Sequence, residues 1–225
     1  SRHLPDPEAK PGWKPAGWNP PAAAAGATSG YNVGEMLKTP TFYGLWICYI
    51  IGALAGLMAI GISKPCGQEV VQCSATAAGY LVGVFAIFNG VGRPFFGWLT
   101  DKITPRGSAI VSFVIIIIAS YLMIKAGPGC TGMYAVAFCG FWLCLGGWLA
   151  IAPTATATYF GTQFYSQIYG VVFTAYGLGA IIGNLACGRI RDLTGSYTYS
   201  FYLTGVLAIL GILIALALLK PPKRG

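Results

Sequence analysis

Six apolar runs, each long enough to cross a bilayer, dominate this sequence. They cover residues 42–62, 75–100, 108–125, 131–158, 167–189 and 198–219. A membrane-spanning helix needs about 20 mostly apolar residues, so each run is a candidate span. Only 9% of the residues are charged, whereas soluble domains carry about 25%. We therefore predict an all-α membrane protein whose six transmembrane helices sit in a lipid bilayer.

The net charge of +8 does not indicate nucleic-acid binding, because the cations lie at the ends of the apolar runs. Because six spans put both chain ends on the same side of the membrane, nine cations lie on that side: Arg2, Lys10, Lys14, Lys38, Lys102, Arg106, Lys220, Lys223 and Arg224. The other side has four: Lys64, Lys125, Arg189 and Arg191. Since basic loops stay in the cytoplasm, we expect a multi-pass protein of the cell membrane with cytoplasmic termini. Arg189 and Arg191 run against this rule.

The chain outside the apolar runs is short and different in composition. Residues 1–40 are rich in Pro, Gly and Ala and are expected to form a mobile cytoplasmic linker. Residues 41–219 would form the transmembrane bundle, and residues 220–225 a basic cytoplasmic tail. The seven cysteines show no paired C-x-x-C spacing, so we expect no metal site and no cofactor. A disulfide between Cys66 and Cys73, which share one predicted external loop, is left open.

An internal repeat relates the two halves of the bundle. Gly92, Gly97 and Asp101 recur 91 positions later as Gly183, Gly188 and Asp192. The same offset places the first three spans over the last three. Since three is odd, the second unit enters the membrane from the opposite side. We therefore predict two inverted three-helix repeats.

Arg93 is the one charge inside the second apolar run. Placing a guanidinium near the bilayer centre costs about 2.5–3.5 kcal/mol, which favours a polar cavity around it. An arginine stays charged and presents a planar fork that matches a carboxylate. Asn89 and Phe85 precede it on the same side of the helix. We predict that Arg93 binds a small carboxylate anion with help from Asn89 and Phe85; the alternative is an arginine that snorkels or braces helices.

The fifth span offers further candidates for the same site. Phe173, Tyr176 and Asn184 follow one another at helical spacing, and the repeat aligns Asn184 with Arg93. Each polar side chain could line a cavity or bond to a neighbouring helix. We expect all three to contribute to substrate binding.

The turn after the second span carries a second candidate function. Gly97 would allow two helices to touch, and Asp101 could cap the next helix or pair with a base. With Lys102 and Arg106, this turn resembles the signature loop of major facilitator proteins, which implies a gating latch. The alternative is a plain solvated turn, and Pro105 departs from the glycine usual near that position.

The whole chain resembles the linker and second half of oxalate/formate antiporters and their monocarboxylate-porter relatives. The resemblance rests on Asn89-Gly-Val-Gly-Arg93-Pro94, Tyr159-Phe-Gly161, Thr174-Ala-Tyr176-Gly177 and Asp192-Leu-Thr-Gly195-Ser-Tyr197. It implies the C-terminal half of a twelve-helix fold, an alternating-access mechanism, a substrate-binding arginine at position 93, and a missing N-terminal six-helix half as partner.

Two departures bear on the substrate. The resemblance implies a second cation on the fifth span, yet residues 167–188 contain no Lys or Arg. A single arginine favours a monocarboxylate over a dianion. Asn89 stands where proton-coupled relatives carry an aspartate, so exchange and proton symport both remain open. A non-transporting receptor or scaffold is the alternative function, and no paired acids or nucleophile–base sets suggest an enzyme.

Overall fold

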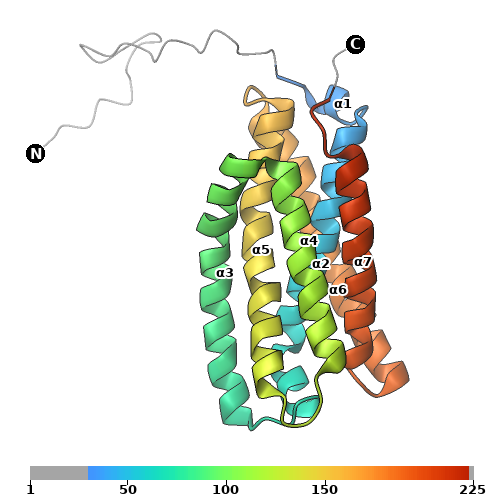
Figure 1. The fold of residues 1–225 in the computed structure, drawn as a ribbon. Helices are drawn as coiled ribbons and strands as arrows, with labels where there is room; N and C mark the ends of the chain where they lie inside the picture. The colour runs from blue at the N-terminus through green and yellow to red at the C-terminus, as the bar shows by residue number, and fades with distance from the viewer. Residues whose placement is uncertain (1–29, 223–225) are drawn as a thin grey trace, which may run out of the picture.

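A computed structural model describes residues 30–222 of the 225-residue chain. Within that range the regular structure is helical throughout. The helices are α1 (Val33–Met36), α2 (Pro40–Glu69), α3 (Ala75–Ile103), α4 (Pro105–Lys125), α5 (Thr131–Phe160), α6 (Tyr165–Thr194) and α7 (Thr198–Leu218). The six long helices form one bundle, and residues 30 and 222 lie at the same end of it (Figure 1). We call this end the terminal end and the opposite one the far end.

All six predicted spans are confirmed as long apolar helices, α2 to α7. The observed helices extend past several of the predicted limits. Helix α2 continues beyond residue 62, through Pro65, and ends at Glu69. This extension places Cys66 inside a helix and fully buries it, so the expected loop position of this cysteine is wrong. The Cys66 and Cys73 thiols are both free.

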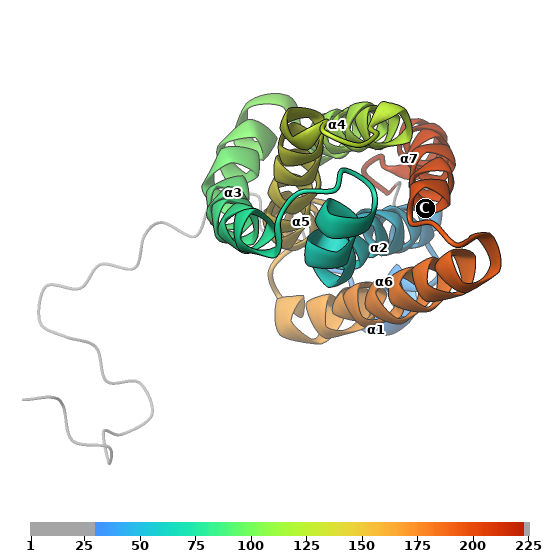
Figure 2. The same ribbon diagram turned by 90° about the horizontal axis from the view of Figure 1, so that it is seen from below.

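The inverted repeat is confirmed by helix bounds and by packing. Shifting the bounds of α2 by 91 positions gives 131–160, the bounds of α5. Helix α3 packs on α5 as α6 packs on α2, and α4 packs on α5 as α7 packs on α2. Seen along the bundle, α2 and α5 lie inside, α4 and α7 lie together along one edge, and α3 and α6 occupy separate flanks (Figure 2).

The segment before α2 is docked on the terminal end. The Tyr31 backbone N–H donates to the Phe160 carbonyl at 2.9 Å, and the Tyr31 ring meets the Phe160 ring edge-on. Asn32 and Glu35 form a capping box on α1, and Met36 is fully buried. The last part of the segment expected to be a mobile linker is therefore packed, while residues 1–29 lie outside the described residues.

Candidate functional site

Arg93 on α3 and Tyr176 on α6 lie at similar depth in the bundle, on opposite flanks. Along α3, Arg93 is about 15 Å from the Ile103 end, at roughly 1.5 Å per residue. Along α6, Tyr176 is about 17 Å from the Tyr165 start. Both distances are measured from the terminal end, so the two side chains lie at similar depth on α3 and α6.

The Arg93 side chain is exposed and has no bonding partner among residues 30–222. The structure gives it neither a hydrogen bond nor an ion pair within that range. Tyr176 of α6, on the opposite flank, is partly buried. A cation on α3 and a phenol on α6 therefore lie at similar depth, and each is a group that can bond to an anion.

Close helix packing fixes the backbone around Arg93. A Cβ atom at Gly92 would overlap the Leu143 carbonyl oxygen of α5, and one at Gly146 would overlap the Asn89 carbonyl oxygen of α3. The Asn89 Nδ2 also donates to the Trp142 carbonyl at 3.2 Å. Asn89 therefore bonds α3 to α5, and the second hydrogen of its Nδ2 remains as a donor for a ligand.

The same close packing recurs at the other flank. Gly183, the repeat partner of Gly92, lies against the Leu54 carbonyl of α2, and Gly179 lies against the Ile50 carbonyl. The repeat thus aligns two equivalent helix crossings. Gly179 and Gly183 thus let α6 pack closely on α2, whereas Gly79 and Gly83 of α3 have nothing within 4 Å of a built Cβ.

A ladder of stacked aromatic rings runs along α6 to Tyr176. The ring centroids are 5.6 Å apart for Tyr165–Tyr169, 5.7 Å for Tyr169–Phe173 and 5.3 Å for Phe173–Tyr176. Tyr49 of α2 lies behind the last two rings, at 6.3 and 6.1 Å. Phe173 and Tyr176 are therefore held together at a depth similar to that of Arg93.

An open pocket lies at the terminal start of this ladder, between α5 and α6. Its volume is about 560 Å³, and it is lined by Pro153, Thr154, Ala157, Thr158, Thr162, Tyr165 and Ser166. Five of these side chains carry hydroxyl groups. Sequence inspection missed this pocket, although the Thr154–Thr158 spacing of one helical turn was a visible signal.

Two predicted site residues lie away from Arg93. Phe85 is fully buried and packs on Tyr134 and Phe138 of α5, so its ring belongs to the core. Asn184 is exposed, but it lies about 12 Å further along α6 than Tyr176 and donates to the Ala180 carbonyl of its own helix. Inverted symmetry makes Asn184 equivalent to Arg93 while placing it nearer the far end.

The turn after α3 differs from expectation in two respects. Thr104, not Asp101, caps α4, because its Oγ1 accepts the Gly107 N–H at 3.3 Å. The capping role expected for Asp101 is therefore wrong. A Cβ at Gly97 would meet nothing within 4 Å, so residues 30–222 contain no close helix contact there.

The charges of this turn are free of ion pairs within the described range. Asp101 and Lys102 are exposed at the end of α3, and Arg106 is partly buried in the first turn of α4. None of them takes part in the single ion pair found in residues 30–222. The turn therefore presents unneutralised charge at the terminal end.

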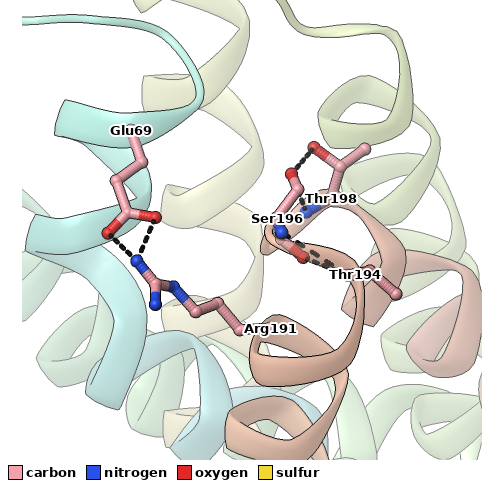
Figure 3. Close-up of polar contacts among 5 residues, drawn as sticks. All are labelled: Glu69, Arg191, Thr194, Ser196 and Thr198. Atoms are coloured by element: carbon pink, nitrogen blue, oxygen red, sulfur yellow. Dashed lines mark hydrogen bonds and ion pairs between the residues drawn. The ribbon is translucent and has the colours of Figure 1, made fainter.

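That ion pair joins α6 to α2 at the far end. Arg191 Nη2 donates to both Glu69 carboxylate oxygens, at 3.2 and 3.4 Å (Figure 3). The guanidinium also lies 5.8 Å from the Tyr197 ring centroid. Partial burial and the nearby Glu69 carboxylate raise the pKa of the Tyr197 hydroxyl. Glu69 was missed from the sequence because it lies beyond the predicted end of its span.

The turn that follows Arg191 is closed by hydroxyl groups. Ser196 Oγ donates to Thr198 Oγ1 at 3.1 Å, and Thr194 Oγ1 donates to the Ser196 carbonyl at 3.1 Å (Figure 3). Among residues 30–222, no group of three or more His, Cys, Asp or Glu side chains could hold a metal ion. Arg93, Asn89 and Tyr176 supply a cation, an amide and a phenol at similar depth in the bundle.

The sequence model of the protein family described as the Major Facilitator Superfamily matches residues 45–225 of this chain. This chain belongs to that superfamily. The chain is 31% identical over 202 residues to the oxalate:formate antiporter of Oxalobacter formigenes, covering 87% of this chain and 46% of that protein. It is 28% identical over 137 residues to human monocarboxylate transporter 12, covering 60% of this chain and 27% of the relative.

Solved structures of the superfamily share the fold. The transporter FucP in its outward conformation superposes with a TM-score of 0.65 at 13% identity, covering 79% of this chain and 42% of that one. The chain thus spans less than half the length of these proteins. The superfamily assignment agrees with the six-helix, doubly repeated bundle of a multi-pass membrane protein.

Proposed function

We propose that this chain forms the anion-binding part of a secondary transporter for small organic anions, with Arg93 as the carboxylate ligand. The exposed, unpaired Arg93 at mid-depth is the observation that carries this proposal. A buried or paired arginine would have favoured a purely structural role. An intramembrane charge without a partner is a functional-site candidate because its insertion cost needs a compensating contact.

The substrate class is a small monocarboxylate. Arg93 supplies one positive charge, and α6 contributes a phenol at Tyr176 and an apolar ring at Phe173 but no cation before Arg189. One guanidinium neutralises one carboxylate, and the aromatic rings suit a short carbon chain. Formate and monocarboxylates in the names of the relatives support this class, whereas oxalate, also named, carries two carboxylates.

The remaining predicted residues take supporting roles in this proposal. Asn89 offers the second hydrogen of its Nδ2 as a donor to the carboxylate, and Phe85 stiffens the aromatic core behind α3. Asn184 would contribute from nearer the far end. The hydroxyl-lined pocket and the aromatic ladder would form the approach from the terminal end to Arg93.

The transport cycle requires a second bundle. Alternating access in this fold rocks one six-helix unit against another around a central site. Gly97, Asp101, Lys102 and Arg106 would form a latch at the terminal end, since their charges are unpaired within residues 30–222 and Gly97 leaves room for a helix. In this proposal the terminal end is cytoplasmic.

Substrate-dependent thermal shifts test the binding site directly. The purified chain is titrated with formate, lactate and oxalate, and with acetamide as the uncharged control. Arg93→Ala should abolish the carboxylate shift. Arg93→Lys should retain weak binding at best, because it keeps the charge and loses the fork. Asn89→Ala should be milder, since it removes one neutral hydrogen bond worth about 0.5–1.5 kcal/mol.

Uptake in vesicles then separates a transporter from a receptor or scaffold. The isolated chain should insert into the vesicle membrane but show no saturable carboxylate uptake. The transporter that contains both bundles should show saturable uptake that depends on Arg93. Wild-type carboxylate affinity in Arg93→Ala would show that the arginine is structural. Binding without uptake in the two-bundle protein would favour the receptor.

A further inference from the structure

A second, basic pocket lies at the terminal end, between the start of α2 and the end of α7. Its volume is about 330 Å³, and it is lined by Lys38, Thr39, Pro40, Thr41, Ala217, Leu218, Lys220, Pro221 and Pro222. It is remote from Arg93, which lies about 15 Å deeper in the bundle on a different flank. The proposed transport site does not use it.

The pocket presents positive charge from two directions. Lys38 and Lys220 are both exposed, and neither takes part in the one ion pair found in residues 30–222. The Thr41 N–H lies in the first turn of α2, where a backbone donor has no acceptor within its own helix. Because α2 is 30 residues long, its N-terminus also carries a partial positive charge. Two lysines and the N-terminus of α2 therefore border one cavity.

The pocket walls are held in place by contacts between α2 and α7. The Thr41 hydroxyl donates to the Lys220 carbonyl at 2.7 Å, which ties the two walls together. Below this bond, Gly44 has no room for a side chain because Leu218 lies against it. The two ammonium groups are thus presented by a backbone that is fixed before any ligand arrives.

The surface next to the pocket is apolar and exposed. On α7, Leu213 and Leu216 are 57% and 41% exposed, and on α2, Tyr43 is 48% exposed. Leu213 and Leu216 are about one turn apart on α7, which ends at Leu218, two residues before Lys220. In a membrane-spanning helix, such side chains face acyl chains. A headgroup in the pocket would continue into acyl chains along this surface, whereas free phosphate would leave the surface unused.

The geometry points to a binding site for the phosphate headgroup of an anionic phospholipid in the Lys38–Lys220 pocket, with acyl chains along α7. Basic pockets at the end of a transmembrane bundle bind such headgroups by charge and hydrogen bonding. A zwitterionic lipid carries the same phosphate, but its own cation competes with the two lysines. The site therefore selects lipids with a net negative charge.

Lipid titration of the full chain in neutral detergent micelles tests this site. Phosphatidylglycerol, phosphatidylcholine and inorganic phosphate are added separately, and bound lipid is counted by native mass spectrometry alongside the thermal shift. Phosphatidylglycerol should bind and raise the melting temperature, and the other two should not. Lys38→Gln with Lys220→Gln should weaken phosphatidylglycerol binding about 30-fold, from the usual contribution of two lysines near an anionic headgroup.

The matched control removes two lysines from the far end. Lys64→Gln with Lys125→Gln changes the net charge equally and should leave phosphatidylglycerol binding unchanged. Lys38→Arg with Lys220→Arg keeps both positive charges in the pocket and should also leave this binding unchanged. Unchanged binding in the Lys38/Lys220 Gln variant, or an equal loss in the control, would overturn the site. An equal effect of inorganic phosphate would overturn the lipid assignment.

Discussion

Gly146 shows how a residue without a side chain can decide the position of a functional one. It lies on α5 against the Asn89 carbonyl, one turn before Arg93 on α3. The contact brings two backbones together, and the Asn89–Trp142 hydrogen bond closes the same crossing at 3.2 Å. The depth and direction of Arg93 therefore depend on a glycine of another helix.

Gly146→Val should destabilise the bundle and displace the turn that carries Arg93. The added atoms overlap α3, and overpacking of this kind costs about 1–3 kcal/mol. The thermal midpoint in detergent should fall, and carboxylate binding should weaken at temperatures where the variant is still folded. Gly83→Ala is the control, because a Cβ at Gly83 meets nothing within 4 Å. Equal stability of both variants would show that this crossing is looser than described.

At the scale of elements, the turn between α3 and α4 carries backbone strain that its repeat partner avoids. Thr104 has φ 93° and ψ 153°, a region favourable only for glycine. Pro105 directly follows and disfavours the helical alternative for Thr104. At the equivalent position after α6 stands Gly195, with φ 74°. The turn next to Asp101 is therefore strained where the turn next to Asp192 is relaxed.

Thr104→Gly should stabilise the chain by about 1 kcal/mol, because it removes strain of about 1–3 kcal/mol and glycine is a tolerable N-cap. The thermal midpoint should rise by about 2–4 °C. Gly195→Thr is the reciprocal variant and should lower the midpoint. A fall in both variants would mean that the Thr104 cap bond outweighs the strain.

For the whole molecule, the charge distribution predicts which end of the bundle faces the cytoplasm. The bundle places residues 30 and 222 at one end, with Asp101, Lys102 and Arg106 at that same end (Figure 1). At the far end, Glu69 pairs with Arg191, one of the two cations that run against the positive-inside rule. The expected orientation is therefore a cytoplasmic terminal end.

Membrane-impermeant thiol reagents test this orientation. Cys73 and Cys130 are partly exposed at the far end and should react from outside the cell. Cys66 and Cys144 are buried and should stay unlabelled. Asp101→Cys in a background without Cys73 and Cys130 should react only in inside-out vesicles. The opposite labelling pattern would invert the assigned topology.

The sequence alone determined the number of spans, the repeat and the presence of one intramembrane cation. Mean hydropathy is a local sum over about 20 residues, so it identifies a span without knowledge of its neighbours. The internal repeat can likewise be recognised from the sequence, because glycines and aspartates recur at a spacing of 91 residues. These predictions agree with the structure because they do not depend on which helices are in contact.

Only the tertiary structure decided which side of each helix faces its neighbours. Phe85 and Arg93 belong to the same helix, yet Phe85 is fully buried and Arg93 is exposed. Lipid-facing and core-facing side chains are equally apolar, so periodicity cannot distinguish them in a membrane helix. The contact between α3 and α5, set by Gly92 and Gly146, determines that difference. The sequence could not identify long-range pairs such as Glu69–Arg191 either, because the two residues meet only when α2 and α6 pack together.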